Sequence, residues 1–262
     1  MARIRLDTLL AERGLMESRS RAAAAVMAGQ VHLGPGRRRA EKPGQLVAPD
    51  VDVSVEGVQP YVSRGGTKLA NALDALGLDP AGRRCLDVGA STGGFTDCLL
   101  QRGAEHVVAL DVAYGELHWT LREDPRVTVV ERVNARALDA GQLPYRPDLV
   151  VADLSFISLT KVLPAVLACT AEVFDCLAMI KPQFEVGRAA ISRGGVVRDP
   201  GERRRALLAV AREISGPGVA VQGFASSGLP GPSGNRETFV WLTEDGRPGV
   251  ADLEAAVAEV DA

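Results

Sequence analysis

Residues 87–95, Asp-Val-Gly-Ala-Ser-Thr-Gly-Gly-Phe, decide the fold of this chain. They follow an apolar run at 85–88 that is typical of a buried strand, and they precede a helix predicted over 96–102. Glycines at such a turn let the backbone bend sharply and approach a ligand closely. A dinucleotide loop would carry glycine where Ser91 stands, and a phosphate site disfavours an acid at Asp87. The turn therefore predicts a cofactor site that is not a phosphate site, or else a glycine-rich turn without a ligand.

The segments downstream continue the alternation of strand and helix. Apolar runs at 107–111, 127–130, 149–153 and 176–181 are separated by helix-like segments, and a β-prone run at 237–242 follows a Gly/Pro loop. This alternation predicts an α/β domain with a parallel sheet covered by helices on both faces. We expect Lys68 to open the first helix of that domain.

The first 58 residues show another pattern. A first helix is expected from Leu6, ended by Gly14, and a second over 19–28 with Ser18 as its N-cap. Strands are expected over 31–33 and 51–55, with a turn at 34–36 between them. The pattern predicts a small α+β domain at 1–58, a linker at 59–66 and a larger domain at 67–262.

Charge is unevenly distributed along the chain. The net charge is −3 over 262 residues, yet residues 1–45 hold nine Lys or Arg against four Asp or Glu, a net of +5 that leaves −8 for the rest. A basic head on an acidic body is typical of a polyanion-binding appendage, and a solvated basic surface is the simpler alternative. No Cys-x-x-Cys pair or histidine cluster predicts a metal site, and no signal peptide or membrane-spanning run is recognisable. We expect a cytoplasmic protein with no bound metal.

The acid before the glycine turn favours a cationic or zwitterionic ligand. S-adenosylmethionine is such a ligand, because its sulfonium and ammonium groups are stabilised by nearby carboxylates. Asp111 ends the second strand, where a carboxylate can accept from both ribose hydroxyls, and Asn134 follows the third strand beside the expected adenine. The predicted cofactor-binding residues are Asp87, Gly89, Ala90, Ser91, Thr92, Gly93, Gly94, Phe95, Asp111, Val112, Asn134, Ala135 and Asp153.

Four charged residues stand at the ends of predicted elements. Asp153 and Lys181 follow apolar strands, Glu237 opens the last strand and Lys68 opens a helix. Each alone is more often a structural salt-bridge partner, but all four are expected at the ligand-binding edge of one sheet. Such a set suits methyl transfer to a ribose 2′-hydroxyl, which needs a base or at least orientation.

These segments carry a family resemblance. Residues 87–95, 111–117, 153–158, 181–187 and 229–237 resemble the motifs of the TlyA family, bacterial rRNA cytidine 2′-O-methyltransferases related to the FtsJ methyltransferases. The resemblance spans nearly the whole chain and implies a Rossmann-like class I methyltransferase sheet. It also implies a catalytic Lys-Asp-Lys-Glu set at Lys68, Asp153, Lys181 and Glu237, and it implies that Phe156 and Ser233 shape the S-adenosylmethionine pocket.

The N-terminal domain is similar to the S4 RNA-binding domain. The resemblance implies binding to rRNA in the 30S and 50S ribosomal subunits, and a monomer fits an enzyme that must dock on a large RNA surface. By their positions, the residues expected to contact the RNA backbone are Arg5, Arg19, Arg21, Lys42, Arg64 and Arg136. Residues 59–62 read Gln-Pro-Tyr-Val where known members carry Arg-Ala-Trp-Val, so Tyr61 replaces a tryptophan.

Other functions remain possible at this point. A catalytically weak RNA-binding protein would be expected to have lost residues such as Asp87, Asp153 or Lys181, and all three are present. A haemolysin, a label this family has carried, would need a membrane-inserting or strongly amphipathic segment, and none is recognisable. A pseudouridine synthase also joins an S4 domain to a catalytic domain but leaves the glycine turn unexplained.

Overall fold

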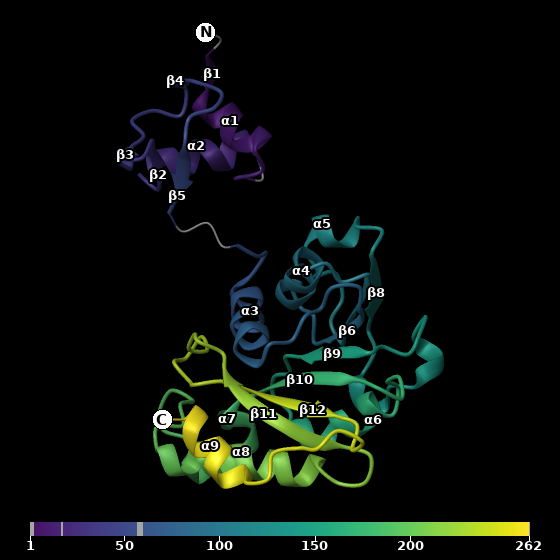
Figure 1. The fold of residues 1–262 in the computed structure, drawn as a ribbon. Coiled ribbons are helices and arrows are strands. Elements are labelled where there is room, and N and C mark those ends of the chain that lie inside the picture. The colour runs from purple at the N-terminus through teal and green to yellow at the C-terminus, as the bar shows by residue number, and fades with distance from the viewer. Residues whose placement is uncertain (1–2, 17, 57–59, 262) are drawn as a thin grey trace. The chain divides into compact units, whose positions relative to one another are not determined.

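The computed structural model describes residues 3–16, 18–56 and 60–261, and it divides into two compact units, Met1–Pro60 and Tyr61–Ala262. Each unit has a hydrophobic core of its own. Figure 1 shows the elements of both. Of the residues named for the linker, Gln59 lies outside the described part of the chain.

The N-terminal unit is a small α+β fold. Its elements are β1 (Ile4–Arg5), α1 (Leu6–Glu12), α2 (Arg19–Met27), β2 (Val31–Leu33), β3 (Arg38–Arg39), β4 (Leu46–Val47) and β5 (Val53–Val55). Leu6 and Leu10 of α1 pack with Val26 of α2 and Val31 of β2 in its core. The predicted cap is confirmed, because the Ser18 hydroxyl oxygen accepts a hydrogen bond from the backbone N–H of Arg21 at 3.2 Å.

One turn in this unit differs from the prediction. The segment at 34–36 leads from β2 into β3, whereas β5 pairs with the other side of β2. The sequence did not reveal β3 because its two residues, Arg38 and Arg39, are both exposed and show no apolar alternation.

The second unit is built on a seven-stranded sheet in the order β11-β12-β10-β9-β6-β7-β8. Its strands are β6 (Arg84–Val88), β7 (His106–Asp111), β8 (Val127–Glu131), β9 (Leu149–Ala152), β10 (Asp175–Ile180), β11 (Ala220–Ser226) and β12 (Thr238–Thr243). Its α-helices are α3 (Arg64–Leu76), α4 (Gly94–Gln101), α5 (Trp119–Arg122), α6 (Leu163–Leu167), α7 (Pro182–Glu185), α8 (Pro200–Ile214) and α9 (Leu253–Val260). The described part of this unit also contains four short 3-10 helices: η1 (Ala135–Ala137), η2 (Ala140–Gln142), η3 (Leu159–Lys161) and η4 (Arg188–Ala190).

Both faces of this sheet are buried. In β7, Val107 and Ala109 join the core cluster that includes α3 and α4, whereas Val108 and Leu110 join the cluster that includes α6, α8 and α9. Figure 1 shows α3 and α4 on the opposite side of the sheet from α8 and α9. The predicted α/β domain with helices on both faces is confirmed.

The sheet is not wholly parallel, which corrects the prediction at one edge. β8, β7, β6, β9 and β10 run parallel, but β12 pairs antiparallel with both β10 and β11. The start of β12 therefore lies beside the end of β10, and Thr238 pairs with Ile180. The chain runs from β6 outward to β8 and then returns to β9 on the other side of β6. Open α/β sheets bind ligands at such a reversal, outside the carboxyl ends of the strands.

The first helix of this unit begins earlier than predicted. α3 starts at Arg64 with Ser63 as its N-cap, so Lys68 lies within the helix and does not open it. Gly65 and Gly66 lie in the first turn of this helix. Gly66 is required by packing, because a side chain there would overlap the ring of Tyr61.

None of the helices in the described part of the chain has the length and hydropathy of a membrane-spanning segment.

Candidate active site

The glycine turn joins β6 to α4, at the point where the strand order reverses. Gly89 has a φ of +84°, and a Cβ there would lie 2.5 Å from the backbone oxygen of Asp153. Only glycine therefore lets the end of β6 approach the residue that follows β9. This close approach places Asp153 beside the turn.

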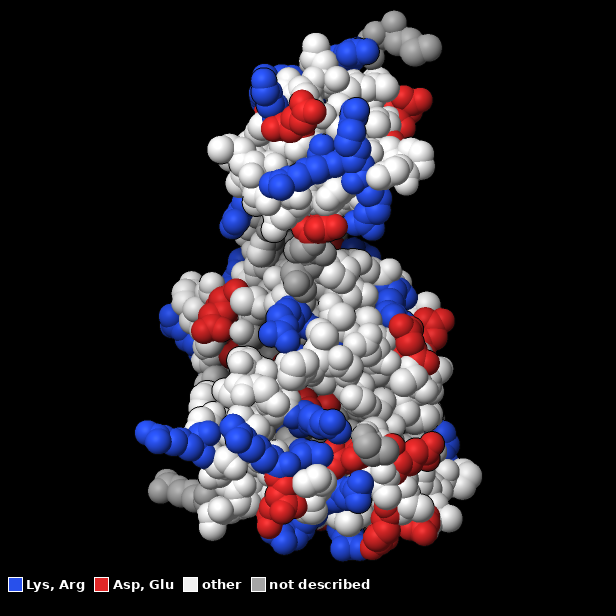
Figure 2. All heavy atoms as spheres, turned by 90° about the vertical axis from the view of Figure 1, so that its left-hand side faces the viewer, with Lys and Arg blue, Asp and Glu red and all other residues white. Residues whose placement is uncertain are grey.

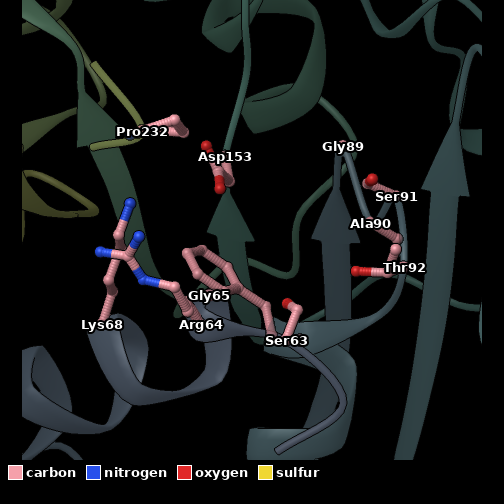
Figure 3. Close-up of a pocket in the computed structure, with 12 residues that line it drawn as sticks. Ser63, Arg64, Gly65, Lys68, Gly89, Ala90, Ser91, Thr92, Asp153 and Pro232 are labelled. Atoms are coloured by element: carbon pink, nitrogen blue, oxygen red, sulfur yellow. The ribbon is translucent and has the colours of Figure 1, made fainter. Parts of the chain in front are cut away.

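A first cavity of about 370 Å³ opens between this turn and the start of α3. Figure 3 shows Asp153 between the turn residues 89–92 and the α3 residues Arg64 and Lys68. Seven of the predicted cofactor-binding residues line this cavity: Gly89, Ala90, Ser91, Thr92, Gly94, Phe95 and Asp153. The other lining residues are Ser63, Arg64, Gly65, Lys68 and Pro232.

A second cavity of about 430 Å³ shares Pro232 with the first. It is lined by Ser155, Phe156, Lys181, Gln183, Phe184, Ile191, Gly195, Gly231, Pro232, Ser233, Asn235 and Glu237. Phe156 and Ser233, which the family resemblance assigns to the cofactor pocket, thus line the second cavity and not the one at the glycine turn.

Two ion pairs join the four charged residues predicted to meet. The Lys68 ammonium pairs with the Glu237 carboxylate, and the Lys181 ammonium pairs with Asp153. Lys68 and Asp153 line the first cavity, whereas Lys181 and Glu237 line the second. Each ion pair therefore crosses the boundary between the two cavities.

Lys181 has a second partner on the loop after β9. Its ammonium donates a hydrogen bond to the Ser155 hydroxyl oxygen at 2.9 Å. Two acceptors, Asp153 and Ser155, thus hold the Lys181 ammonium group in the lining of the second cavity.

Phe156 is exposed to solvent, which is unusual for a large apolar residue. Its side chain is 91% exposed, and its φ of +64° is unusual for a bulky residue. Its ring centroid lies 5.2 Å from that of Phe184, at an interplanar angle of 49°. Exposed aromatic rings held by a strained backbone are typical of ligand-binding positions.

Asp87 does not line either cavity. It is fully buried, and its Oδ2 accepts hydrogen bonds from the backbone N–H of Thr96 at 2.9 Å and from the Thr96 hydroxyl at 2.7 Å. Its other oxygen, Oδ1, is buried without a hydrogen-bond partner. Burial raises the pKa of Asp87 to about 7, against the hydrogen bonds from Thr96, which lower it. The carboxyl group fixes the start of α4 behind the turn.

Asp111 lines a third, narrow cavity of about 10 Å³ with Ser91 and Glu116. Its oxygens accept from the backbone N–H of Ser91 and of Ala113, both at 2.8 Å, which ties the glycine turn to the end of β7. The predicted residues Val112, Asn134 and Ala135 do not line any of these three cavities. The Asn134 side chain caps η1, because its Oδ1 accepts from the backbone N–H of Arg136 at 3.1 Å.

The sequence of this chain is similar to those of known methyltransferases. Residues 61–244 match the FtsJ-like methyltransferase family. The chain is 51% identical to the 16S/23S rRNA (cytidine-2′-O)-methyltransferase TlyA of Mycobacterium tuberculosis over 92% of this chain and 90% of that protein. The chain belongs to the TlyA family. It is also 37% identical to Hemolysin A of Brachyspira hyodysenteriae, over 89% of this chain and 97% of that protein.

The chain is also similar to a solved structure. A hemolysin-named protein from Streptococcus thermophilus matches 99% of this chain and 96% of its own with a TM-score of 0.71 and 34% identity. The similarity to this structure covers nearly the whole chain, and the second unit contains the FtsJ-like methyltransferase domain.

Several residues that shape the site of this TlyA-family chain were missed in the sequence. Ser63 and Gly65 line the first cavity, and the Ser63 side chain makes no cap hydrogen bond to α3. The signal was present, since a serine before a helical segment is a common N-cap, but the glycines obscured it. Glu185 was also missed; its carboxylate accepts from the backbone N–H of Leu159 at 2.9 Å and so ties α7 to the loop after β9.

The basic residues predicted to bind RNA fall into two groups. Arg5 donates two hydrogen bonds to the buried Asp7, at 3.1 and 2.6 Å, and Arg19 lies 3.9 Å from the same carboxylate, while Arg21 and Lys42 are exposed. The hydrogen bonds from Arg5 hold the pKa of Asp7 below its ordinary value. Figure 2 shows more Lys and Arg than Asp and Glu on the visible face of the N-terminal unit.

The other two basic residues belong to the methyltransferase unit. Arg64 lines the first cavity and donates to the backbone oxygen of Pro230 at 2.8 Å, whereas Arg136 is exposed. Among the described residues, no cluster of His, Cys, Asp or Glu could hold a metal ion.

Proposed function

We propose that this chain transfers a methyl group from S-adenosylmethionine to the ribose 2′-hydroxyl of a cytidine in ribosomal RNA. The observation that carries the proposal is the pair of ion pairs that cross the boundary between the first and second cavities. Transfer of a group between two bound molecules requires that they be held side by side in a fixed orientation, and these ion pairs stand where the two cavities meet. The identity of the acceptor follows from the named activity of the relative in Mycobacterium tuberculosis.

The first cavity suits S-adenosylmethionine. The hydroxyl of Ser63, which makes no cap hydrogen bond, and the backbone N–H groups at the start of α3 can bind a carboxylate. Gly89 and Gly94 let the turn approach the Asp153 backbone and the start of α3 closely, because a Cβ at either position would collide with them. We assign the ribose hydroxyls to Asp111, which lines the small neighbouring cavity together with Ser91. When bound, S-adenosylmethionine supplies a methyl group on a positively charged sulfur. The residues that would hold it are Ser63, the turn and Asp111.

Lys181 is the residue that we assign to the acceptor hydroxyl. Its contacts with Asp153 and Ser155 fix the ammonium group at the edge of the second cavity. We infer that Lys181 orients the 2′-hydroxyl and that its neutral amine form, left once the ammonium has released a proton to solvent, takes the hydroxyl proton during transfer, a role worth about 10²- to 10⁴-fold in rate. Asp153 would hold Lys181 in place, and the Lys68–Glu237 pair would fix the opposite side of the boundary.

The second cavity suits a nucleotide that is not stacked in a duplex. The exposed ring of Phe156, paired with Phe184, offers a surface on which a nucleobase can stack. We therefore place Phe156 and Ser233 on the RNA side of the site. Replacing Phe156 with alanine is expected to raise the KM for RNA while leaving cofactor affinity unchanged.

We assign RNA binding chiefly to the N-terminal unit, through Arg5, Arg19, Arg21 and Lys42. Its resemblance to the S4 domain and its net positive charge support this division. The proposed partners are the rRNAs of both ribosomal subunits, the proposed state is a monomer, and the proposed location is the cytoplasm. Deleting residues 1–58 is expected to abolish binding to ribosomal subunits while the remaining unit still binds S-adenosylmethionine. Unchanged subunit affinity in the truncated chain would contradict this division.

The central experiment compares Lys181→Ala with Lys161→Ala, an exposed lysine on η3 as control. Transfer of tritiated methyl to 30S and 50S particles is measured, and cofactor affinity is measured by calorimetry. Lys181→Ala is expected to lose at least about 100-fold in kcat with cofactor affinity within twofold, and the control is expected to retain activity. Full activity in Lys181→Ala would exclude the proposed mechanism.

A further inference from the structure

One buried amide side chain joins two loops of the second cavity. Asn235 is 2% exposed, and its Oδ1 accepts a hydrogen bond from the backbone N–H of Val197 at 2.9 Å. Its Nδ2 donates to the backbone oxygen of Gly195, also at 2.9 Å. The amide thus binds the main chain of a segment about 40 residues away, as a neighbouring strand would.

The segment held in this way is a wall of the second cavity. Residues 191–197 form a tight loop in which the Ser192 N–H donates to the Val196 oxygen at 2.9 Å and the Gly195 N–H donates to the Ser192 oxygen at 3.0 Å. Ile191 and Gly195 of this loop line the second cavity together with Lys181 and Glu237. The loop is held to the rest of the site through Asn235.

Asn235 is fixed from its own side as well. Its backbone oxygen accepts from the Gly231 N–H at 2.8 Å, which closes the loop that precedes β12. Glu237, the partner of Lys68, follows two residues later. A short segment therefore positions both a charged residue of the cavity boundary and the opposite wall of the second cavity.

We propose that Asn235 is a positioning residue that fixes loop 191–197 against the second cavity and thereby sets the orientation of the target nucleotide. The inference rests on the proposed function. It assigns Asn235 no direct contact with the reacting atoms, because the described hydrogen bonds of its amide go to the main chain of residues 195 and 197.

The chemistry of the contact requires asparagine. One donor and one acceptor must lie side by side to pair with a backbone C=O and a backbone N–H. Aspartate retains the acceptor but sets an oxygen against the Gly195 oxygen, and alanine leaves both main-chain groups unpaired. Each lost buried hydrogen bond changes the equilibrium of the loop by roughly tenfold.

The test uses Asn235→Ala and Asn235→Asp in the full chain, with Asn71→Ala as the matched control. Asn71 also donates from its amide to a backbone oxygen, that of Ser227 at 2.9 Å, but it lines neither cavity. The first readout is the rate of tryptic cleavage after Arg193, an exposed residue of loop 191–197. The second is kcat/KM for methyl transfer to ribosomal subunits, and the third is the Kd of S-adenosylmethionine.

Asn235→Ala is expected to speed cleavage after Arg193 about tenfold and to lower kcat/KM for the subunits about tenfold or more, with the cofactor Kd within twofold. Asn235→Asp is expected to lie between wild type and Asn235→Ala, and Asn71→Ala to match wild type in all three. Unchanged cleavage in Asn235→Ala, or an equal loss of kcat/KM in Asn71→Ala, would overturn the proposal. If wild type itself transferred no methyl group, the proposed function would fail while the cleavage rates still tested the role of Asn235.

Discussion

The buried carboxyl of Asp87 should make the methyltransferase unit less stable as pH rises. Asp87 is fully buried, and burial raises its pKa to about 7 from an ordinary value of 3.8. Between these values the unfolded chain has released the proton while the folded chain still holds it. The unfolded state then binds fewer protons, so the free energy of unfolding falls from about pH 4 to pH 7 and levels off above.

The size of the effect follows from the two pKa values. A difference of about three pKa units corresponds to roughly 4 kcal/mol, of which about 2.5 kcal/mol develops between pH 5 and pH 8. Replacing Asp87 with asparagine removes the titration but leaves an amide near Thr96. Asp87→Asn therefore lowers the free energy of unfolding by an amount that does not depend on pH. Between pH 5 and pH 8 the wild type loses about 2.5 kcal/mol of stability that the variant does not lose.

The assay is urea unfolding followed by tryptophan fluorescence at pH 5, 6, 7 and 8. Both tryptophans, Trp119 and Trp241, lie in the methyltransferase unit, so the signal reports that unit alone. Thr96→Val is the companion variant: losing the hydroxyl that donates to Asp87 is expected to raise its pKa further and extend the fall in stability beyond pH 7. A stability difference between wild type and Asp87→Asn that does not change with pH would refute the reasoning.

Two further predictions concern the glycine turn and Asp175, the first residue of β10. Gly89→Ala is expected to lose about 2–4 kcal/mol of stability and more than tenfold in cofactor affinity, because φ is positive and the Cβ would meet the Asp153 oxygen. Gly115→Ala is the control, because Gly115 also has a positive φ but a Cβ there would meet no other atom; it should cost about 1 kcal/mol of stability. Equal effects of the two substitutions on urea unfolding and on cofactor affinity would contradict the role given to the Asp153 contact. Asp175→Ala is expected to cost about 2 kcal/mol in urea unfolding with cofactor affinity unchanged, because the buried carboxylate accepts from Arg83, Arg247 and the Trp241 indole. Arg83 keeps its contact with Asp148 and Arg247 keeps its contact with Glu244, and a loss below about 0.5 kcal/mol would contradict the prediction.

The sequence predicted best the elements whose signals are local. The β6–turn–α4 segment was predicted because an apolar run, glycines at fixed positions and a helical segment follow one another directly. The start of α3 was misplaced because Gly65 and Gly66 lower helix propensity, and what permits them is their packing against Ser63 and Tyr61. β3 was missed because two exposed residues carry no periodic pattern.

The cavities depend on contacts that no local pattern records. Asn235 and Glu185 lie in recognisable motifs, but their hydrogen bonds to Val197 and Leu159 join segments far apart in the sequence. Polar side chains that bind distant main-chain groups cannot be distinguished by type or spacing from those that face a ligand.

Glu237 was expected at the same sheet edge as Lys181, but the wholly parallel sheet that was also expected would not place it there. In a wholly parallel sheet, a residue at the start of a strand lies at the edge opposite the carboxyl ends of its neighbours. Because β12 runs antiparallel to β10, with Thr238 beside Ile180, the start of β12 instead reaches the edge where β9 and β10 end. There Glu237 meets Lys68 while Asp153 meets Lys181. The reversed strand is thus what allows two ion pairs, and not one, to stand at the boundary between the two cavities.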